Sequence, residues 1–389
     1  MSAVALADVA ATGDRAGVLD LLATMDDKAR RAARKPLDAA WKDLTRADSR
    51  EVRDAVTLAA LGCCVTSAEA ARALISLWRR QRDSSDWAGP QVDAFAGRDA
   101  GWLAEAGRRV AATVPVRRPN DWALSGHRNG ELYRLARGLL WMAGAVPAAD
   151  DGFVLEWALT KWRRKPEHTL ADVVRPGWAP GEGTVAEAFR ADPYTAVFLP
   201  LAFGITGFGT FLVHDWHWRP DLLALTETGE LDRVTLIDRC VDGLVRGGRA
   251  VEMRGFQKLL DEVQPTEDEL AERAADWAGL AGRAEMPSAG RAVESLRRLL
   301  DAGRLDIGLL TETSYAVLAR PEKTLVRAHV KLVAEALRRT PGDAAALLPA
   351  IASAFGHDDT TVQEQAWRLA ARHLATAGEA VRAQLADAL

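Results

Sequence analysis

The segment LVRAHVKLVAEAL (residues 325–337) is followed 36 residues later by TVQEQAWRLAARH (residues 361–373), which has the same apolar pattern. This offset superposes three apolar positions: Val326 on Val362, Val330 on Ala366 and Val333 on Leu369. Apolar residues three and four apart form one face of a helix, so both segments predict amphipathic α-helices. Each helix needs neighbours to bury its apolar face, which indicates a repeating helical unit.

The same spacing extends outward through the last hundred residues. Apolar periodicity predicts helices near residues 291–301, 306–319, 324–339, 344–356 and 361–375, which begin about 18 residues apart. Two helices then form a helix–turn–helix unit of about 37 residues. Short polar connections at 320–323 and 357–360 precede two of these helices, and we expect a threonine to cap each following helix.

The rest of the chain also has helical periodicity. Segments that alternate apolar and polar residues with β-branched enrichment are nearly absent, and proline or glycine falls between helical stretches. The expected fold class is therefore all-α, an α-solenoid of stacked antiparallel helix pairs. Composition shifts at PAADDG (147–152) and EMPSAG (285–290) predict three parts: N-terminal helical bundle or repeats at 1–147, a middle helical segment at 148–286, and C-terminal repeats at 287–389.

One stretch resembles a known repeat family. LLPAIASAFGHDDTTVQEQAWRLAARHL (347–374), with one helix, an acidic turn and a second helix opening on Val-Gln, looks like a HEAT-type repeat. Through residues 191–212, 229–270 and 319–339 the chain resembles the N-terminal part of large, uncharacterised helical-repeat proteins of GC-rich bacteria. The resemblance implies HEAT-like repeats with no known biochemical role and carries over no catalytic residues. The chain is shorter than most such proteins, so we expect a natural short form or a truncated chain.

Charge and composition narrow the class of protein. The 389 residues are 48% hydrophobic and 27% charged, and 54 acidic against 50 basic residues give a formal net charge of −4. Attraction of the whole chain to DNA or to an anionic membrane is not expected, although a local basic face stays open. No stretch reaches the roughly 18 apolar residues that a membrane span needs, and the N-terminus has no targeting signal.

Three cysteines, Cys63, Cys64 and Cys240, are too few for a disulfide framework and lack the spacing of a metal or redox site. We therefore expect a cytoplasmic protein without a cofactor.

Two motifs raise the question of a metal or phosphate site. His214, Asp215 and His217 could supply part of a zinc or iron site, but further ligands would have to come from elsewhere, and a turn packed by tryptophans is the simpler interpretation. The glycines of GITGFGT (204–210) allow close approach of an anion, yet no strand or Gly-Lys-Ser/Thr motif accompanies them. Close helix packing or a turn explains these glycines better.

Basic and aromatic residues interleave at WRRQR (78–82) and KWRRK (161–165), an arrangement that suits phosphates and bases. Both clusters lie where helices are expected to end, and arginines there also satisfy orphan carbonyls. Helix capping with a solvated face is the simpler interpretation. Nucleic-acid binding would be favoured if the arginines of these and nearby clusters lay on one surface, namely Arg79, Arg80, Arg82, Arg117, Arg118, Arg163 and Arg164.

Tryptophan is unusually frequent, with 13 Trp against nine Phe and three Tyr. Trp41, Trp78, Trp141, Trp157 and Trp367 fall in phase with apolar neighbours and are expected in the core. The candidate partner-binding surface combines tryptophans with the second basic cluster, namely Trp162, Arg163, Arg164, Trp178, Trp216 and Trp218.

These observations predict a non-catalytic scaffold or adaptor that binds a protein partner on the concave face of the solenoid. No general acid–base pair or nucleophile pattern is found, and no catalytic, cofactor or metal residue is assigned. The alternative is a HEAT-like nucleic-acid-binding protein or DNA base-excision enzyme, which needs basic residues of successive units aligned on one concave face, with a Trp and an acid beside a flipped base.

Overall fold

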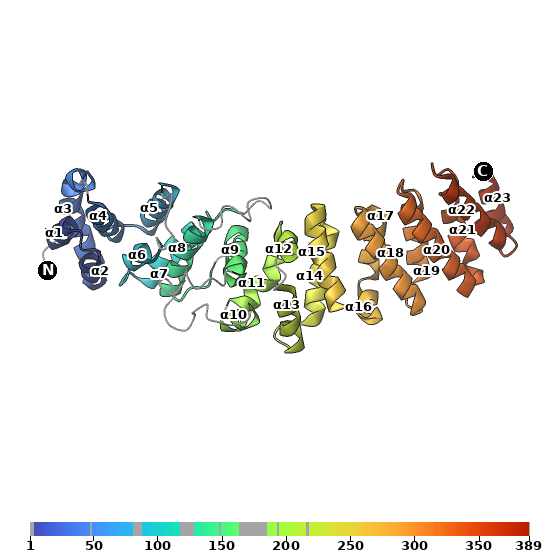
Figure 1. The fold of residues 1–389 in the computed structure, drawn as a ribbon, viewed down its shortest axis with the longest axis horizontal. Helices are drawn as coiled ribbons and strands as arrows, with labels where there is room; N and C mark the ends of the chain where they lie inside the picture. The colour runs from blue at the N-terminus through green and yellow to red at the C-terminus, as the bar shows by residue number, and fades with distance from the viewer. Residues whose placement is uncertain are drawn as a thin grey trace. The chain divides into compact units, whose positions relative to one another are not determined.

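The computed structural model describes residues 4–46, 49–80, 88–116, 128–147, 149–162, 185–192, 194–214 and 218–388. Within these ranges every regular element is a helix and no β-strand occurs, which confirms the all-α class (Figure 1). Contacts divide the chain into two compact units, unit 1 (Met1–Gly207) and unit 2 (Phe208–Leu389). The limits of the three parts inferred from composition stay a prediction. None of the described helices is both long and apolar enough to cross a membrane.

Unit 1 is a succession of short helices: α1 (Val4–Thr12), α2 (Arg15–Thr24), α3 (Asp27–Thr45), α4 (Arg50–Gly62), α5 (Ser67–Arg80), α6 (Ala88–Asp93), α7 (Ala100–Ala111), α8 (Arg128–Met142), α9 (Asp151–Trp162), α10 (Val185–Ala191) and α11 (Thr195–Ala202). The first four pack on one another, α5 packs on α7, and α8 contacts α6, α7 and α9.

A buried arginine joins the helix ends of the first part of unit 1. Arg30 of α3 is only 1% exposed. Its guanidinium donates hydrogen bonds of 2.5 to 3.2 Å to carbonyl oxygens at the ends of α2, α4 and α6, those of Leu22, Met25, Gly62, Ala94 and Ala96. The last carbonyls of a helix have no partner within the helix, so this one side chain satisfies the ends of three helices.

A second arginine supports the same junction. Arg98 donates to the carbonyl oxygens of Gly62 and Cys64, pairs with Asp27 at 2.7 Å, and lies over the Trp102 ring at 4.5 Å. Burial, together with the neighbouring positive charge of Arg98, lowers the pKa of Arg30 to about 10. Arg30 therefore keeps its charge and its donors at neutral pH.

Unit 2 contains α12 (Phe208–His214), α13 (Trp218–Glu227), α14 (Arg233–Arg246), α15 (Ala250–Val263), α16 (Glu267–Glu272), α17 (Ala274–Arg283), α18 (Met286–Asp301), α19 (Ile307–Leu318), α20 (Lys323–Arg339), α21 (Ala344–Ala352), α22 (Thr360–His373) and α23 (Glu379–Asp387), with a short 3-10 helix before α21. The five helices predicted at the end of the chain correspond to α18 to α22. Helix α18 begins earlier than expected because Pro287 lies in its first turn, where no backbone donor is needed.

The helices of unit 2 from α14 onward pack in two rows. Along the first row, α14 contacts α17, which contacts α19, then α21 and α23. Along the second row, α15 contacts α18, which contacts α20, then α22. The pairs α14–α15, α17–α18, α19–α20 and α21–α22 join the rows, and neighbouring helices lie side by side from yellow to red in Figure 1.

Ion pairs connect each helix pair of unit 2 to the next. Arg233 binds Glu269 across 36 residues, Arg273 binds Asp238 across 35, and Arg339 binds Asp301 across 38. These separations match the repeat length found in the sequence, because side chains one repeat apart are neighbours in a stack.

The helix starts follow capping rules, with one difference from expectation. Asp359, not a threonine, caps α22 by accepting from the backbone N–H of Thr361 and Val362, and no side-chain cap bond is made at the start of α20. Asp359 reaches the donors because it occupies the cap position itself, whereas Thr360 is already helical. Thr266 caps α16, in a capping box with Glu269.

Close helix crossing explains part of the glycine-rich segment. A Cβ on Gly255 of α15 would lie 1.8 Å from the carbonyl oxygen of Gly209 in α12, and a Cβ on Gly209 would lie 2.3 Å from that of Glu252. Only glycine on both helices allows this approach. The structure therefore favours packing over phosphate binding for Gly209.

His329 is a fully buried titratable group in the core of unit 2. The Ser314 hydroxyl donates to the Leu310 carbonyl oxygen at 2.7 Å, so it accepts from Nε2 of His329 at 2.9 Å. This bond leaves Nδ1 as the unprotonated nitrogen. Burial lowers the pKa of His329 to about 4, so the ring is neutral in the folded protein.

We predict that Arg30→Met destabilises the protein by about 3 to 5 kcal/mol, because buried carbonyls at three helix ends lose their donors. Arg31→Met, at the adjacent exposed position of α3, is the matched control and should change stability by less than about 0.5 kcal/mol. Urea unfolding followed by circular dichroism measures both variants. Equal stability of the two would contradict the role of Arg30.

We predict that His329→Leu removes part of the acid sensitivity of the fold. Between pH 6.5 and about 4 the unfolded state binds a proton at His329 that the folded state does not bind, so stability falls as the pH falls. The wild type should lose about 3 kcal/mol more than the variant over this interval. Urea unfolding at several pH values tests this, and parallel pH profiles would refute it.

Candidate partner-binding surface

Most of the surface predicted from the sequence falls outside the part of the chain that the structure describes. Trp162 is the last residue of α9, but its side chain is not among the described ones. The residues outside the described ranges are Arg163, Arg164, Trp178 and Trp216. Of the six candidates, the structure thus places the side chain of Trp218 alone.

Trp218 is buried, which corrects the expectation that it lies on the surface. It is 0% exposed and packs edge-on against Phe211 at 4.8 Å and Phe208 at 5.7 Å between ring centroids. The sequence suggested a loop here because of Pro220, but that proline lies in the first turn of α13, where it is tolerated. Trp218 therefore starts a helix and faces α12.

The five tryptophans expected in the core have different environments. Trp157 is fully buried and Trp78 is partly buried, whereas Trp367 is 50% exposed and Trp41 and Trp141 are also exposed. Trp367 lies beside the buried stripe of α22, adjacent to Ala366, and its ring contacts Phe355 edge-on. Being next to an apolar stripe therefore did not ensure burial.

The proposed metal ligands are not placed by the structure. Asp215 and His217, and the side chain of His214, lie outside the described residues, and among the described ones no group of three or more His, Cys, Asp or Glu could hold a metal ion.

The described cysteines are buried thiols. Burial raises the pKa of Cys63 to about 11 and that of Cys64 to about 12, and it also raises the pKa of Cys240. A thiol that stays protonated at neutral pH is a poor nucleophile and a poor metal ligand. These cysteines therefore serve packing.

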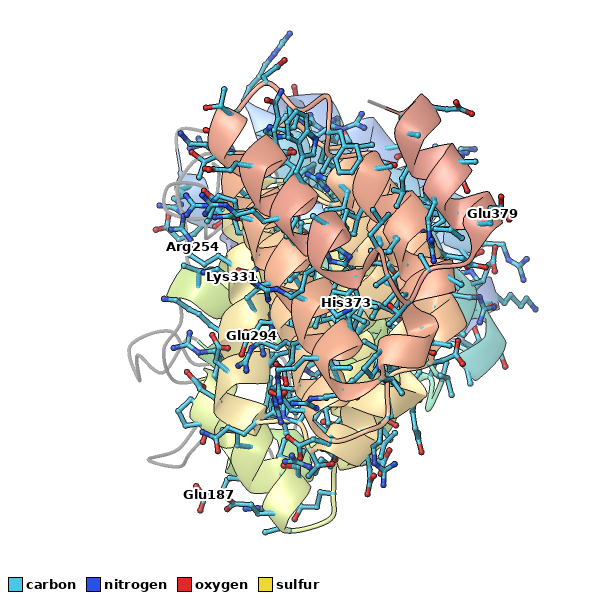
Figure 2. All side chains as sticks on the ribbon, turned by 90° about the vertical axis from the view of Figure 1, so that its right-hand side faces the viewer. Glu187, Arg254, Glu294, Lys331, His373 and Glu379 are labelled. Carbon is cyan, nitrogen blue, oxygen red and sulfur yellow. The ribbon has the colours of Figure 1, made fainter. Side chains whose placement is uncertain are left out.

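Equivalent positions of the second row define a long exposed face. Leu260, Leu296, Val333 and Leu369 are buried equivalents, one on each of α15, α18, α20 and α22. The residues two and six positions before them form what we call the second-row face: Lys258, Glu294, Lys331 and Trp367, with Arg254, Gly290, Arg327 and Gln363. Figure 2 shows Arg254, Glu294 and Lys331 on the same side of unit 2, opposite Glu379 of α23.

Four cations of this face have no counter-ion. Arg254 and Lys258 of α15, and Arg327 and Lys331 of α20, are exposed and form no ion pair or hydrogen bond with other residues of the structure. Each pair places like charges four residues apart on one helix, which destabilises a helix by a few tenths of a kcal/mol. The stacking of the helices does not need these charges.

Helix α18, between the two cation pairs, is internally neutralised. Arg297 donates to Glu294 and to Asp301, and its hydrogen bonds lower the pKa of Glu294. A Cβ on Gly290 would meet no atom within 4 Å, so the surface beside it is open. The second-row face is therefore positive at α15 and α20, with an open and balanced strip between.

The opposite row differs in chemistry. Its exposed residues are mainly small or apolar, including Val234, Val245, Ala275, Gly308, Ala316 and Ala345. The arginine of the first row that reaches furthest, Arg273, binds Asp238, Asp242 and Asp276. Arg283 of α17 and Arg372 of α22 are likewise exposed without a counter-ion among the described residues, so what distinguishes the second-row face is that its unpaired cations stand in i, i+4 pairs at equivalent positions of α15 and α20.

A groove of about 390 Å³ lies at the turn between α14 and α15, against the end of α17 and the start of α18. Gly247, Gly248 and Gly279 leave it open, while Arg283, Asp276 and Glu285 bring both signs of charge to its rim. Ser288 accepts a hydrogen bond from Gln257 at 3.0 Å. These groups make a mixed polar surface without an activated nucleophile among the lining residues.

Sequence reasoning missed the four cations of the second-row face. A signal was present, because Arg254 and Lys258, like Arg327 and Lys331, stand four residues apart within predicted helices. The search for basic residues followed tryptophan-rich clusters, whereas these cations are separated in sequence and are aligned only by the stacking of repeats.

Comparison with protein families, with curated proteins and with solved structures finds no significant match. The chain is an all-helical protein with sequential helix-pair contacts.

We predict that Trp218→Ala destabilises the fold by about 3 to 5 kcal/mol, because a buried indole leaves a cavity among the rings of α12. Trp367→Ala, at a half-exposed position, should cost less than about 1 kcal/mol. Thermal and urea unfolding of both variants measures the difference. A larger loss for Trp367→Ala would show that the burial of the two side chains is misassigned.

Proposed function

We propose that this protein is a non-catalytic scaffold or adaptor, an α-solenoid of HEAT-like repeats that binds a protein partner along one long face. We assign that face to the second-row face of unit 2, and we expect it to be the concave one of the solenoid.

The packing of unit 2 supports the solenoid. First-row helices contact first-row helices, and second-row helices contact second-row helices, from one repeat to the next. Ion pairs between residues 35 to 38 apart join the same neighbours. Solenoids built in this way present extended surfaces, which are commonly used for binding.

The second-row face supports partner binding, and its unpaired cations carry the proposal. Four cations without counter-ions lie at equivalent positions of α15 and α20, with α18 between them, and one half-exposed tryptophan lies at the equivalent position of α22. Complementary charges orient two proteins as they meet and raise the rate of their association, and tryptophan is a frequent hot-spot residue of protein interfaces. The i, i+4 spacing of the like charges does not stabilise the helices, and the Trp367 ring is half exposed although it contacts Phe355.

Strongly shifted titratable groups of unit 2 have structural roles, which supports a non-catalytic function. Hydrogen bonds from Arg338 and Arg339 lower the pKa of Glu335 to about 2. Arg339 also donates to the Leu300 carbonyl oxygen and to Asp301, so its hydrogen bonds connect α20 to α18. A perturbed pKa is a sign of an active site only where packing does not account for it.

The aligned cations also favour a second candidate, nucleic-acid binding, because phosphates seek several basic residues on one face. Acidic residues outnumber basic ones in unit 2, and Glu294 lies on the face itself. A dense polyanion would meet these carboxylates. A protein partner is therefore the better proposal.

The test is affinity purification of the full, tagged chain from native lysate, with and without nuclease. We expect a protein partner at stoichiometric level that survives nuclease treatment, identified by mass spectrometry. Arg30→Met, which is expected to destabilise unit 1, controls for capture by transiently exposed core. Recovery of nucleic acid that vanishes with nuclease or moderate salt would replace the adaptor by the nucleic-acid candidate.

A further inference from the structure

We infer that the second-row face of unit 2 binds an acidic polypeptide segment, whose carboxylates pair with Arg254 and Lys258 on α15 and with Arg327 and Lys331 on α20. This inference rests on the proposed function and names the chemistry of the partner.

Charge complementarity is the first argument. All three arginines of α18 have carboxylate partners within the described part of the chain: Arg291 binds Asp261, Arg297 binds Glu294, and Arg298 binds Glu267. The four cations of the face lack one, and each stands next to a like charge on the same helix. Carboxylates from outside would relieve both repulsions, which a neutral partner would not do.

The geometry sets the spacing of the partner's acids. Helices α15 and α20 both contact α18 and stand two helix spacings apart in the row, which is about 16 to 20 Å. An extended chain covers that distance in about six residues. We therefore expect two acidic pairs about six residues apart, with small residues between them over Gly290, where the surface is open.

Trp367 extends the site by one further repeat. It occupies on α22 the position that Lys331 occupies on α20, and it is half exposed. An indole at this place binds an apolar side chain, about one helix spacing beyond the second acidic pair. The segment that fits the face thus carries an apolar residue after its acids.

A polypeptide fits this face better than a nucleic acid. Glu294 lies between the cation pairs, held by Arg297, and Asp261 and Glu262 lie close in sequence to Lys258. A phosphate backbone places a negative charge at every step and would meet these carboxylates. A peptide places its acids only where cations stand.

The experiment uses the full chain and a fluorescein-labelled peptide with two Glu–Glu pairs about six residues apart and a following leucine. A second peptide has Gln in place of each Glu. The protein variant combines Arg254→Gln, Lys258→Gln, Arg327→Gln and Lys331→Gln. Its matched control combines Arg283→Gln and Arg372→Gln, exposed arginines that do not belong to the second-row face.

Fluorescence anisotropy titrations should show the Glu peptide binding at least about tenfold more tightly than the Gln peptide, more weakly as salt rises. The fourfold variant should lose at least about tenfold in affinity, and the control should stay within about twofold. Unfolding measurements should show that the fourfold variant keeps its stability, since like charges have been removed.

Two outcomes overturn the inference: equal binding of the Glu peptide to the fourfold variant and to wild type, or tighter binding of labelled DNA than of the Glu peptide to the same face. Capture of a protein partner from lysate distinguishes a failure of this inference from a failure of the proposed function. If wild type and the fourfold variant capture the same partner equally, the adaptor proposal stands and the acidic-segment inference falls. If wild type captures no protein, the proposed function itself fails.

Discussion

Unit 2 depends on one contact, the stacking of each helix pair on the next. An isolated amphipathic pair cannot bury its apolar stripe, and Leu260, Leu296, Val333 and Leu369 are buried in a stack in which each second-row helix contacts the next. The ion pairs that cross from repeat to repeat follow the same geometry. Two sides of each helix are occupied by this packing, and the outer side is left for solvent or for a partner.

The stacking of the helices also separates charged residues that hold the fold together from charged residues that have no partner within it. An arginine that forms an ion pair with the previous helix pair, as Arg339 does with Asp301, is explained by its contribution to the packing of the fold. Arg327 and Lys331 lie on the same helix, α20, but on its outer side, and neither forms an ion pair with a described carboxylate. Their i, i+4 spacing costs stability, whereas the short-range spacing of Glu294 and Arg297 on α18 contributes it. The contrast between these neighbouring helices points to binding.

The sequence predicted the fold class, whereas Trp218, the one candidate site side chain that the structure describes, is buried and not on the surface as expected. Repetition of the apolar pattern at 325–337 and 361–373 identified the repeat and placed α19 to α22 closely, because apolar periodicity is a local property. It could not show that Trp218 is buried, since Pro220 is compatible both with a loop and with the first turn of a helix. Nor could it show that Arg254 and Arg327 share a face, which follows only from the stacking of α15, α18 and α20.

Arginines donate to carbonyl oxygens at helix ends in both units, but the guanidinium is buried in unit 1, at Arg30, and lies nearer the surface in unit 2, at Arg339. In unit 1, carbonyl oxygens from three helix ends accept hydrogen bonds from the buried guanidinium of Arg30, so a positive charge lies in the protein interior. In unit 2, from α14 onward, ion pairs near the surface join neighbouring helix pairs. The cations of the second-row face form no such pairs and are exposed at equivalent positions of their helices. Long-range attraction to such a face acts before contact is made, and the Trp367 indole adds affinity only after docking. Salt should therefore weaken the encounter with an acidic segment more than the apolar contact that follows it.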